Sequence, residues 1–169
     1  MKKLLVIDRH NYDGITEEIV RKAVRGIIFR GSKLLLVQGC DGVPKLPGGG
    51  QDEGEDNITT LCREVREETG FNIDPSTVKE FGSIEEKRLS YYEPLIFHQF
   101  NDLYLCEITG EQIDCEYSRN ELERGFRPVW YTPEEALERL SATRENTPES
   151  REFSTFLLIK DYIREKEKK

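Results

Sequence analysis

Three glutamates, Glu64, Glu67 and Glu68, are spaced as i, i+3 and i+4. On an α-helix this spacing places their carboxylates on one side of the helix. Like charges at this separation repel each other by about 0.2–0.5 kcal/mol per pair. A hard divalent cation removes the repulsion, because Mg²⁺ takes oxygen ligands and is commonly held by a few carboxylates together with substrate phosphate. The spacing therefore predicts a Mg²⁺ or Mn²⁺ site suited to phosphate chemistry.

The segment that carries these glutamates has the start and stop signals of a helix. Either Asp56 or Asn57 can be the N-cap, because a short polar side chain accepts from the free amides of the first turn. Gly70 can end the helix, since glycine adopts the left-handed conformation without steric cost. The apolar residues between them recur at helical spacing and form one face: Ile58, Leu61, Cys62 and Val65. We expect a packed helix over residues 57–69, in contrast to a fully solvated acidic helix.

The helix lies within a longer sequence pattern. Residues 49–71 read GGQDEGEDNITTLCREVREETGF and fit G-x5-E-x7-R-E-U-x-E-E-x-G-U, where U is apolar. All nine fixed positions are filled, which is far more specific than a lone glycine motif. The chain therefore resembles the Nudix hydrolases, which cleave the diphosphate bond of a nucleoside diphosphate linked to another group. The resemblance implies an α/β fold, an α/β/α sandwich around a mixed β-sheet.

The resemblance also implies roles for individual residues. Arg63 matches a residue that braces a glutamate of the pattern and, with Glu55, holds the loop and helix together. Bound Mg²⁺ or Mn²⁺ would neutralise the diphosphate oxygens and lower the pKa of a bound water for in-line attack on phosphorus. The positions that match the family's metal ligands are Glu64, Glu67, Glu68 and the carbonyl of Gly48.

The general base is open between two places. In some members of the family a glutamate of the pattern acts as base, which here is Glu64. In others the base or an extra ligand is a glutamate on a loop before the last strand, where this chain has Glu121 and Glu123. Glu121 matches better by its distance before Gly125. The alternative is that both loop glutamates are solvated and take no part.

Apolar patterns predict strands on both sides of the helix. The expected strands cover residues 3–7, 19–29, 33–38, 78–89, 95–108 and 126–131, with loops at 39–54 and 109–123. A helix is expected from Pro133, with Thr132 as its cap and Ala136, Leu137 and Leu140 facing inward. A last helix is expected from Pro148 to about Ile163, with an apolar stripe of Phe153, Phe156, Leu157 and Ile163. Residues 165–169 are expected to fray.

Composition limits the partners. The 169 residues carry a net charge of −8 and contain no repeat or linker, which favours a single Nudix domain over residues 1–169. An acidic protein repels nucleic acid and anionic membranes, so neither is an expected partner. The four cysteines lack zinc-site spacing and are expected to be reduced and mostly buried. The apolar run at 4–7 is too short for a signal peptide or membrane span. We expect a cytoplasmic protein, with a homodimer left open.

The expected substrate is a small nucleotide, with nucleoside triphosphates included. No subfamily signature follows the pattern: the window near Glu86 and Lys87 lacks the proline typical of ADP-ribose hydrolases. Tyr91 and Tyr92 lie slightly too far along for a dinucleoside polyphosphate signature, although either could stack on a base. The alternative function is a non-catalytic module that senses a nucleotide. Such modules usually lose the glutamates of the pattern, which are all present here, so the enzyme is favoured.

The remaining polar and aromatic residues give weaker signals. Arg25 and Arg88 could meet a phosphate or a base, but isolated arginines at strand ends are more often simply exposed. Trp130 is expected in the core beside the last helix. His10 and His98 have no partner motif, so no chemistry is assigned to them.

Overall fold

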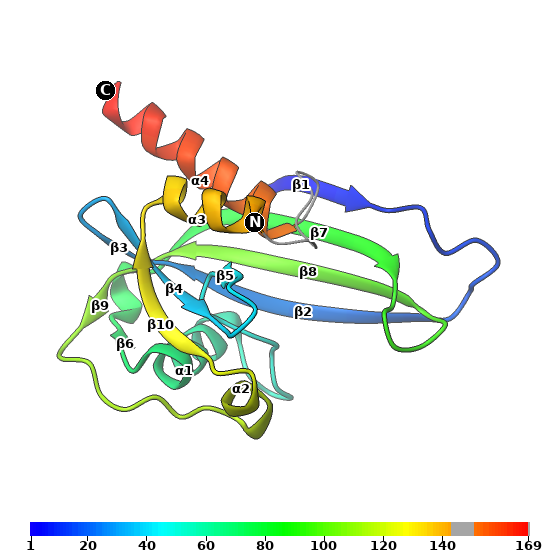
Figure 1. Ribbon diagram of the computed structural model, residues 1–169, viewed down its shortest axis with the longest axis horizontal. Helices are drawn as coiled ribbons and strands as arrows, with labels where there is room; N and C mark the ends of the chain where they lie inside the picture. The colour runs from blue at the N-terminus through cyan, green and yellow to red at the C-terminus, as the bar shows by residue number, and fades with distance from the viewer. Residues whose placement is uncertain (143–150, 169) are drawn as a thin grey trace.

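The computed structural model describes residues 1–142 and 151–168, which form an α/β fold (Figure 1). The strands are β1 (Lys3–Asp8), β2 (Glu18–Ile27), β3 (Phe29–Arg30), β4 (Lys33–Gln38), β5 (Pro44–Lys45), β6 (Asn72–Ile73), β7 (Lys79–Leu89), β8 (Ile96–Leu105), β9 (Ile108–Thr109) and β10 (Arg127–Tyr131). The helices are α1 (Asn57–Thr69), the 3-10 turn η1 (Pro75–Thr77), α2 (Arg119–Glu123), α3 (Pro133–Ser141) and α4 (Arg151–Glu167).

The longest strands form a mixed sheet in the order β1-β7-β8-β2. The pairs β1–β7 and β2–β8 are parallel, whereas β7 and β8 are antiparallel. A second sheet has the order β10-β4-β3, with β5 paired to β4, and β6 pairs with β9. The expected mixed sheet is therefore confirmed.

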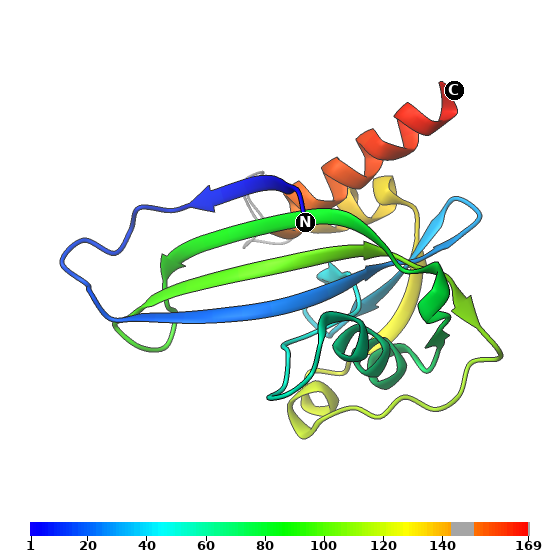
Figure 2. The same cartoon turned by 180° about the vertical axis from the view of Figure 1, so that it is seen from behind.

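Two buried clusters lie on opposite faces of the strands, because successive side chains of a strand point to opposite sides. In β4, Leu34 and Leu36 belong to one cluster and Leu35 to the other. Helices α3 and α4 cover the first cluster and α1 covers the second, which gives the expected α/β/α sandwich (Figures 1 and 2). The helical residues buried in these clusters are Ala136, Leu140, Phe156 and Ile159 on one side, and Leu61 and Val65 on the other.

Helix α1 has the predicted bounds. The Asp56 side chain is the N-cap and accepts a 2.7 Å hydrogen bond from the amide of Thr59. Gly70 ends the helix with φ of 72°. A side chain at Gly70 is excluded, because its Cβ would lie 2.0 Å from the carbonyl oxygen of Ile113.

Two expected loops contain short elements. The segment 39–54 includes β5, and the segment 109–123 ends in α2. Helix α2 forms because Ser118 and Glu121 make a capping box, in which each side chain bonds the other residue's backbone amide. The expected strand 95–108 is interrupted after Leu105, and β9 then pairs with β6.

The C-terminal helix differs in part from its prediction. Helix α4 continues to Glu167, so most of the segment expected to fray is helical. The expected start at Pro148 lies outside the described residues. Phe156 is buried as expected, but Leu157 is 41% exposed, since it points away from the strands that bury Phe156 and Ile159.

Two further predictions about burial were wrong. Trp130 packs on the α1 side of the sheet, edge-on to Phe71 at 6.1 Å between ring centroids, and not beside the last helix. The four cysteines are free as expected, but Cys106 is the buried one and Cys40 is exposed. Among the described residues, no helix is long and apolar enough to cross a membrane.

Candidate active site

The glycine-rich loop 46–50 lies along the edge of β2. The amides of Val24 and Gly26 donate to the carbonyls of Gly49 and Pro47 at 3.0 and 2.9 Å. Gly48 has φ of 133°, and a Cβ there would lie 2.2 Å from the carbonyl oxygen of Val24. Glycine is therefore required for the loop to approach the strand, and the loop is held beside α1.

Glu68 is the most buried carboxylate of the three, with 7% of its surface exposed. The amide of Gly48 donates a 2.7 Å hydrogen bond to its Oε2. Burial raises the pKa of Glu68 to about 7, although the nearby charge of Arg25 opposes the shift. This carboxylate is thus held in a site that disfavours its own negative charge and would gain from a cation.

Glu64 lies directly against the loop. A Cβ added to Gly49 would meet the Glu64 carboxyl carbon at 2.4 Å. Burial raises the pKa of Glu64, and the ion pair with Arg63 acts in the opposite direction. The two carboxylates therefore share an environment in which an added cation would relieve both desolvation and mutual repulsion.

Arg63 connects the loop to the helix. Its guanidinium donates to both carboxylate oxygens of Glu55, at 2.7 and 2.9 Å, and to Glu64 at 2.9 Å. It also donates to Glu67 at 3.3 Å. The bond from Arg63 lowers the pKa of Glu55 to about 2. The contacts match the bracing expected for Arg63 and Glu55, because one planar group spans both elements.

The donor set suits a hard cation, because every candidate atom is an oxygen. In the described residues, however, no three acidic, histidine or cysteine side chains are grouped to hold a metal ion. Arg63 contacts Glu64 and Glu67, and the guanidinium of Arg25 donates to the carbonyl of Gly48. A cation bound by these oxygens would replace the guanidinium groups of Arg63 and Arg25 as their partner. Arg25 is therefore part of the site. Its position in the sequence had instead favoured a simply exposed side chain.

The segment 110–118 satisfies the carbonyls at the end of α1. The amide of Glu116 donates to the carbonyl of Glu67 at 2.8 Å, and the hydroxyl of Tyr117 donates to that of Glu68 at 2.9 Å. This segment leads directly into α2. The backbone of the two glutamates is thus held from outside the sequence pattern.

Glu121 accepts hydrogen bonds from the amide and hydroxyl of Ser118, both at 2.7 Å. Its negative charge contributes to the raised pKa of Glu68, so the two carboxylates interact electrostatically. Glu123 instead forms an exposed pair with Arg119 at 2.9 Å. Of the two loop candidates, Glu121 is the one with an electrostatic link to the glutamates of α1.

We expect Gly49→Ala to fold but to lower activity at least about tenfold. The added methyl group displaces the end of the flexible Glu64 side chain and leaves the backbone of Gly49 unstrained, because its φ is not positive. Steady-state rates and thermal unfolding of the variant check this. Wild-type activity in Gly49→Ala would show that the position of Glu64 does not matter.

Comparison with known proteins places the chain in a family. The family model of the NUDIX domain matches residues 20–154, which include the glycine-rich loop and all of α1. The chain belongs to the NUDIX domain family. The chain is 27% identical over 147 residues to "Putative ADP-ribose pyrophosphatase YjhB" of Bacillus subtilis (strain 168). The aligned region covers 86% of the chain and 63% of that relative, so the chain spans less than two thirds of its length.

Solved structures support the fold. A NUDIX hydrolase from Nitrosomonas europaea superposes with a TM-score of 0.57 at 21% identity, over 84% of this chain and 87% of that chain. The MutT protein from Bacillus halodurans gives a TM-score of 0.55 at 22% identity, over 70% and 72% of the two chains. At these identities the likeness extends to the fold alone.

Several polar residues near the site were not singled out from the sequence. Gln99 and Asn101 are each 2% exposed, and Arg151 pairs with Glu86 at 3.1 Å. The signal was present in β8, where Gln99 and Asn101 occupy the same alternating positions as the buried Leu103. Polar side chains at core-facing positions of a strand need partners, which makes them candidates for a binding site.

Proposed function

We propose that this Nudix hydrolase is a Mg²⁺- or Mn²⁺-dependent pyrophosphohydrolase. Its substrate would be a small nucleotide in which a nucleoside diphosphate is linked to another group, with nucleoside triphosphates and ADP-ribose compounds in the same class. The observation that supports this most is the buried Glu68 carboxylate. It lies beside Glu64 under the glycine-rich loop, where a negative charge is disfavoured unless a cation accompanies it.

In this proposal Glu64, Glu67 and Glu68 would hold the cation, together with the carbonyl of Gly48. When bound there, Mg²⁺ would neutralise the charge of the diphosphate oxygens. The Gly48 amide keeps the Glu68 carboxylate in place at 2.7 Å. Arg63 holds Glu64 at 2.9 Å, and its bonds to Glu55 at 2.7 and 2.9 Å join the helix to the loop.

The alternative is a binding module that senses a nucleotide without cleaving it. The same loop and helix could serve such a module, because phosphate binding alone also needs charge neutralisation. A substrate panel separates the two functions. Purified protein is incubated with Mg²⁺ or Mn²⁺ and with nucleoside triphosphates, ADP-ribose, nucleotide sugars and dinucleoside polyphosphates, and released phosphate, pyrophosphate and nucleoside monophosphate are measured. Hydrolysis of one class supports the enzyme; binding without any product favours the module.

The candidate bases can be separated by comparing Glu64→Gln with Glu121→Gln. We expect Glu64→Gln to lower both metal affinity and rate, with partial rescue at high metal concentration, because this residue would act as a ligand. We expect Glu121→Gln to lower the single-turnover rate by about 10²-fold with a smaller effect on metal affinity, because a base acts only in the chemical step.

Glutamine is a suitable replacement at position 121, since it also fits the third position of a capping box and so preserves α2. Glu123→Gln is the matched control, because Glu123 is exposed and pairs only with Arg119 among the contacts seen. If Glu121→Gln keeps the wild-type rate, α2 has no chemical role and the base must be sought within α1.

A further inference from the structure

The face of the sheet under α4 changes from apolar to polar along its strands. Ile84 and Leu103 belong to the buried cluster beneath α3 and α4. Two residues further along β7, Glu86 is 7% exposed, and two residues back along β8, Asn101 is 2% exposed. Arg25 of β2 lies opposite Leu103 in the parallel register. The apolar core thus ends in a row of buried polar side chains.

Two buried side-chain atoms in the described part of the chain have no hydrogen-bond partner: Nδ2 of Asn101 and Nε of Arg88. Both are donors. The Oδ1 atom of Asn101 accepts a hydrogen bond from Gln99 at 2.7 Å. This bond fixes the orientation of the Asn101 amide and leaves its NH2 group without a partner. Arg88 Nε lies 3.4 Å from a Glu86 oxygen, an ion pair without a hydrogen bond. A buried donor without a partner is unfavourable, so both groups are available to an acceptor supplied by a ligand or a water.

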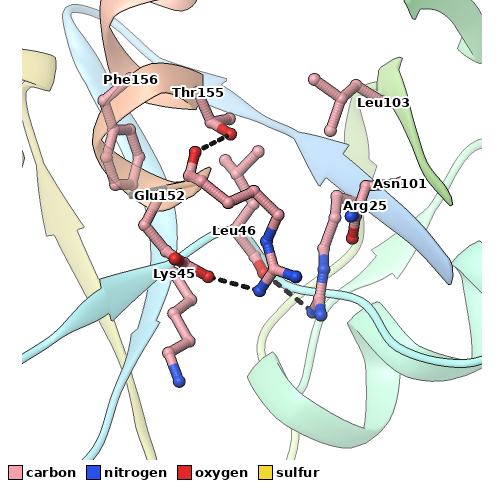
Figure 3. A pocket seen from close by; sticks show the side chains of 9 residues that line it. Arg25, Lys45, Leu46, Asn101, Leu103, Glu152, Thr155 and Phe156 are labelled. Carbon is pink, nitrogen blue, oxygen red and sulfur yellow. Dashed lines mark hydrogen bonds and ion pairs between the residues drawn. The ribbon is translucent and has the colours of Figure 1, made fainter. Parts of the chain in front are cut away.

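Asn101 and Arg88 line two adjoining pockets that share Lys45, Arg151 and Glu152 and are together called the hollow. Asn101 lines its inner recess with Arg25, Lys45 and Glu152 (Figure 3). Arg88 lines the outer part, of about 690 Å³, which shares Lys45 and Glu152 with the recess. This volume is within the range of small-molecule sites. The ligand-sized part is the one that Arg88 lines, whereas the recess beside Asn101, of about 20 Å³, has room for about one water.

The hollow is basic although the chain is acidic. Three carboxylates and twice as many basic side chains line it, in a protein whose net charge is −8. The basic residues are Arg9, Arg25, Lys45, Arg88, Arg124 and Arg151. This local excess of positive charge attracts an anion, which the net negative charge of the whole molecule would otherwise repel.

The hollow adjoins the candidate active site through Arg25. The guanidinium of Arg25 donates to the carbonyl of Gly48, and its side chain also lines the recess. Tyr91 and Tyr92 stand at the outer part and are 78% and 93% exposed. Arg25 is therefore the residue that the hollow and the candidate active site share.

We infer that this hollow binds an anionic, oxygen-rich group of the substrate in addition to the diphosphate that is cleaved. The inference rests on the proposed function. The group is a further phosphate or a carboxylate, which accepts from the arginines of the larger part and is linked to Asn101 Nδ2 through a water. Substrates with such a group are preferred over counterparts that end in a neutral sugar.

Binding is tested without turnover, by titrating the protein with inorganic triphosphate, ATP and adenosine in EDTA. Triphosphate and ATP bind, and adenosine binds at least about tenfold more weakly, because a charge-assisted hydrogen bond contributes about 1.5–3 kcal/mol. Equal binding of adenosine, or no saturable binding of triphosphate and ATP, overturns the inference. This arm does not depend on hydrolysis, so it separates failure of the inference from failure of the proposed function.

The variants are Asn101→Asp and Arg88→Gln, with Arg164→Gln as control. Asn101→Asp keeps an acceptor for Gln99, removes the donor and adds a negative charge, so triphosphate affinity falls about tenfold or more; Arg88→Gln tests the site without adding a negative charge. Arg88→Gln gives a similar loss and serves if Asn101→Asp does not fold. Arg164→Gln removes one positive charge on exposed α4, outside the hollow, and leaves affinity unchanged. Wild-type affinity in folded Asn101→Asp or in Arg88→Gln, or an equal loss in Arg164→Gln, contradicts the assignment.

Turnover distinguishes a substrate group from a separate effector. The kcat/KM values of UDP-glucuronate and UDP-glucose are compared, as are those of ATP and ADP, and triphosphate is tested as an inhibitor of the better substrate. The expected result is a higher kcat/KM for the more anionic member of a pair, reduced selectively by Asn101→Asp, with competitive inhibition by triphosphate. Two outcomes contradict the inference. Non-competitive inhibition would mean that the hollow binds a separate effector, and equal kcat/KM values would mean that it does not distinguish substrates by their charge.

Discussion

Replacing Glu68 by glutamine is expected to lower kcat by about 10³-fold or more while the protein stays folded. The change removes the charge that we propose binds the metal and keeps the size of the side chain, so the packing of α1 is retained. Steady-state and single-turnover rates with Mg²⁺, together with circular dichroism, measure the effect. Glu138→Gln on the exposed side of α3 is the matched control and should behave as wild type.

Although Glu68→Gln lowers the rate, it should make the metal-free protein more stable than wild type at neutral pH. Because the pKa of Glu68 is raised from 4.5 to about 7, the folded protein binds this proton more tightly than the unfolded chain does. The associated stabilisation is complete below pH 4.5 and is lost as the pH rises through 7, by on the order of 1–3 kcal/mol. The Tm of metal-free wild type should therefore fall across this window, and that of Glu68→Gln should fall less. A Glu68→Gln protein that unfolds would make the carboxylate structural.

Removal of divalent metal is expected to abolish hydrolysis. Activity should disappear in EDTA and return when Mg²⁺ or Mn²⁺ is added in excess, because the oxygen donors of α1 suit these hard cations. The ion should also raise the Tm, since a ligand that binds only the folded state stabilises it, by about 2.7 kcal/mol at one hundred times its dissociation constant. Full turnover in excess chelator would contradict the metal requirement.

The sequence predicted best where one local signal decided the structure. Helix α1 has its predicted bounds because Asp56 and Gly70 fix its two ends by short-range hydrogen bonds and backbone conformation. The strand positions followed from alternation, which depends on which face is buried. Helix α2 was missed although Ser118 and Glu121 form a recognisable capping box, because a five-residue helix has little apolar periodicity.

The sequence could not predict contacts between distant segments. Arg25 was interpreted as an exposed strand-end arginine, yet it reaches the carbonyl of Gly48, 23 residues away. The link from Tyr117 to the carbonyl of Glu68 spans 49 residues and depends on how the segment 110–118 lies on α1. Trp130 was expected in the core beside the last helix. The face to which it points is decided by the sheet, and this face packs on Phe71.

The most direct test of the proposed active site is a measurement of Mn²⁺ binding by electron paramagnetic resonance, made on wild type, Glu68→Gln and Glu138→Gln. We expect saturable Mn²⁺ binding by wild type and Glu138→Gln that Mg²⁺ displaces. Binding should be at least about tenfold weaker in Glu68→Gln, in parallel with its loss of hydrolysis. Unchanged Mn²⁺ affinity in Glu68→Gln, or no binding by the wild type, would contradict the assignment of α1 as the metal-binding helix.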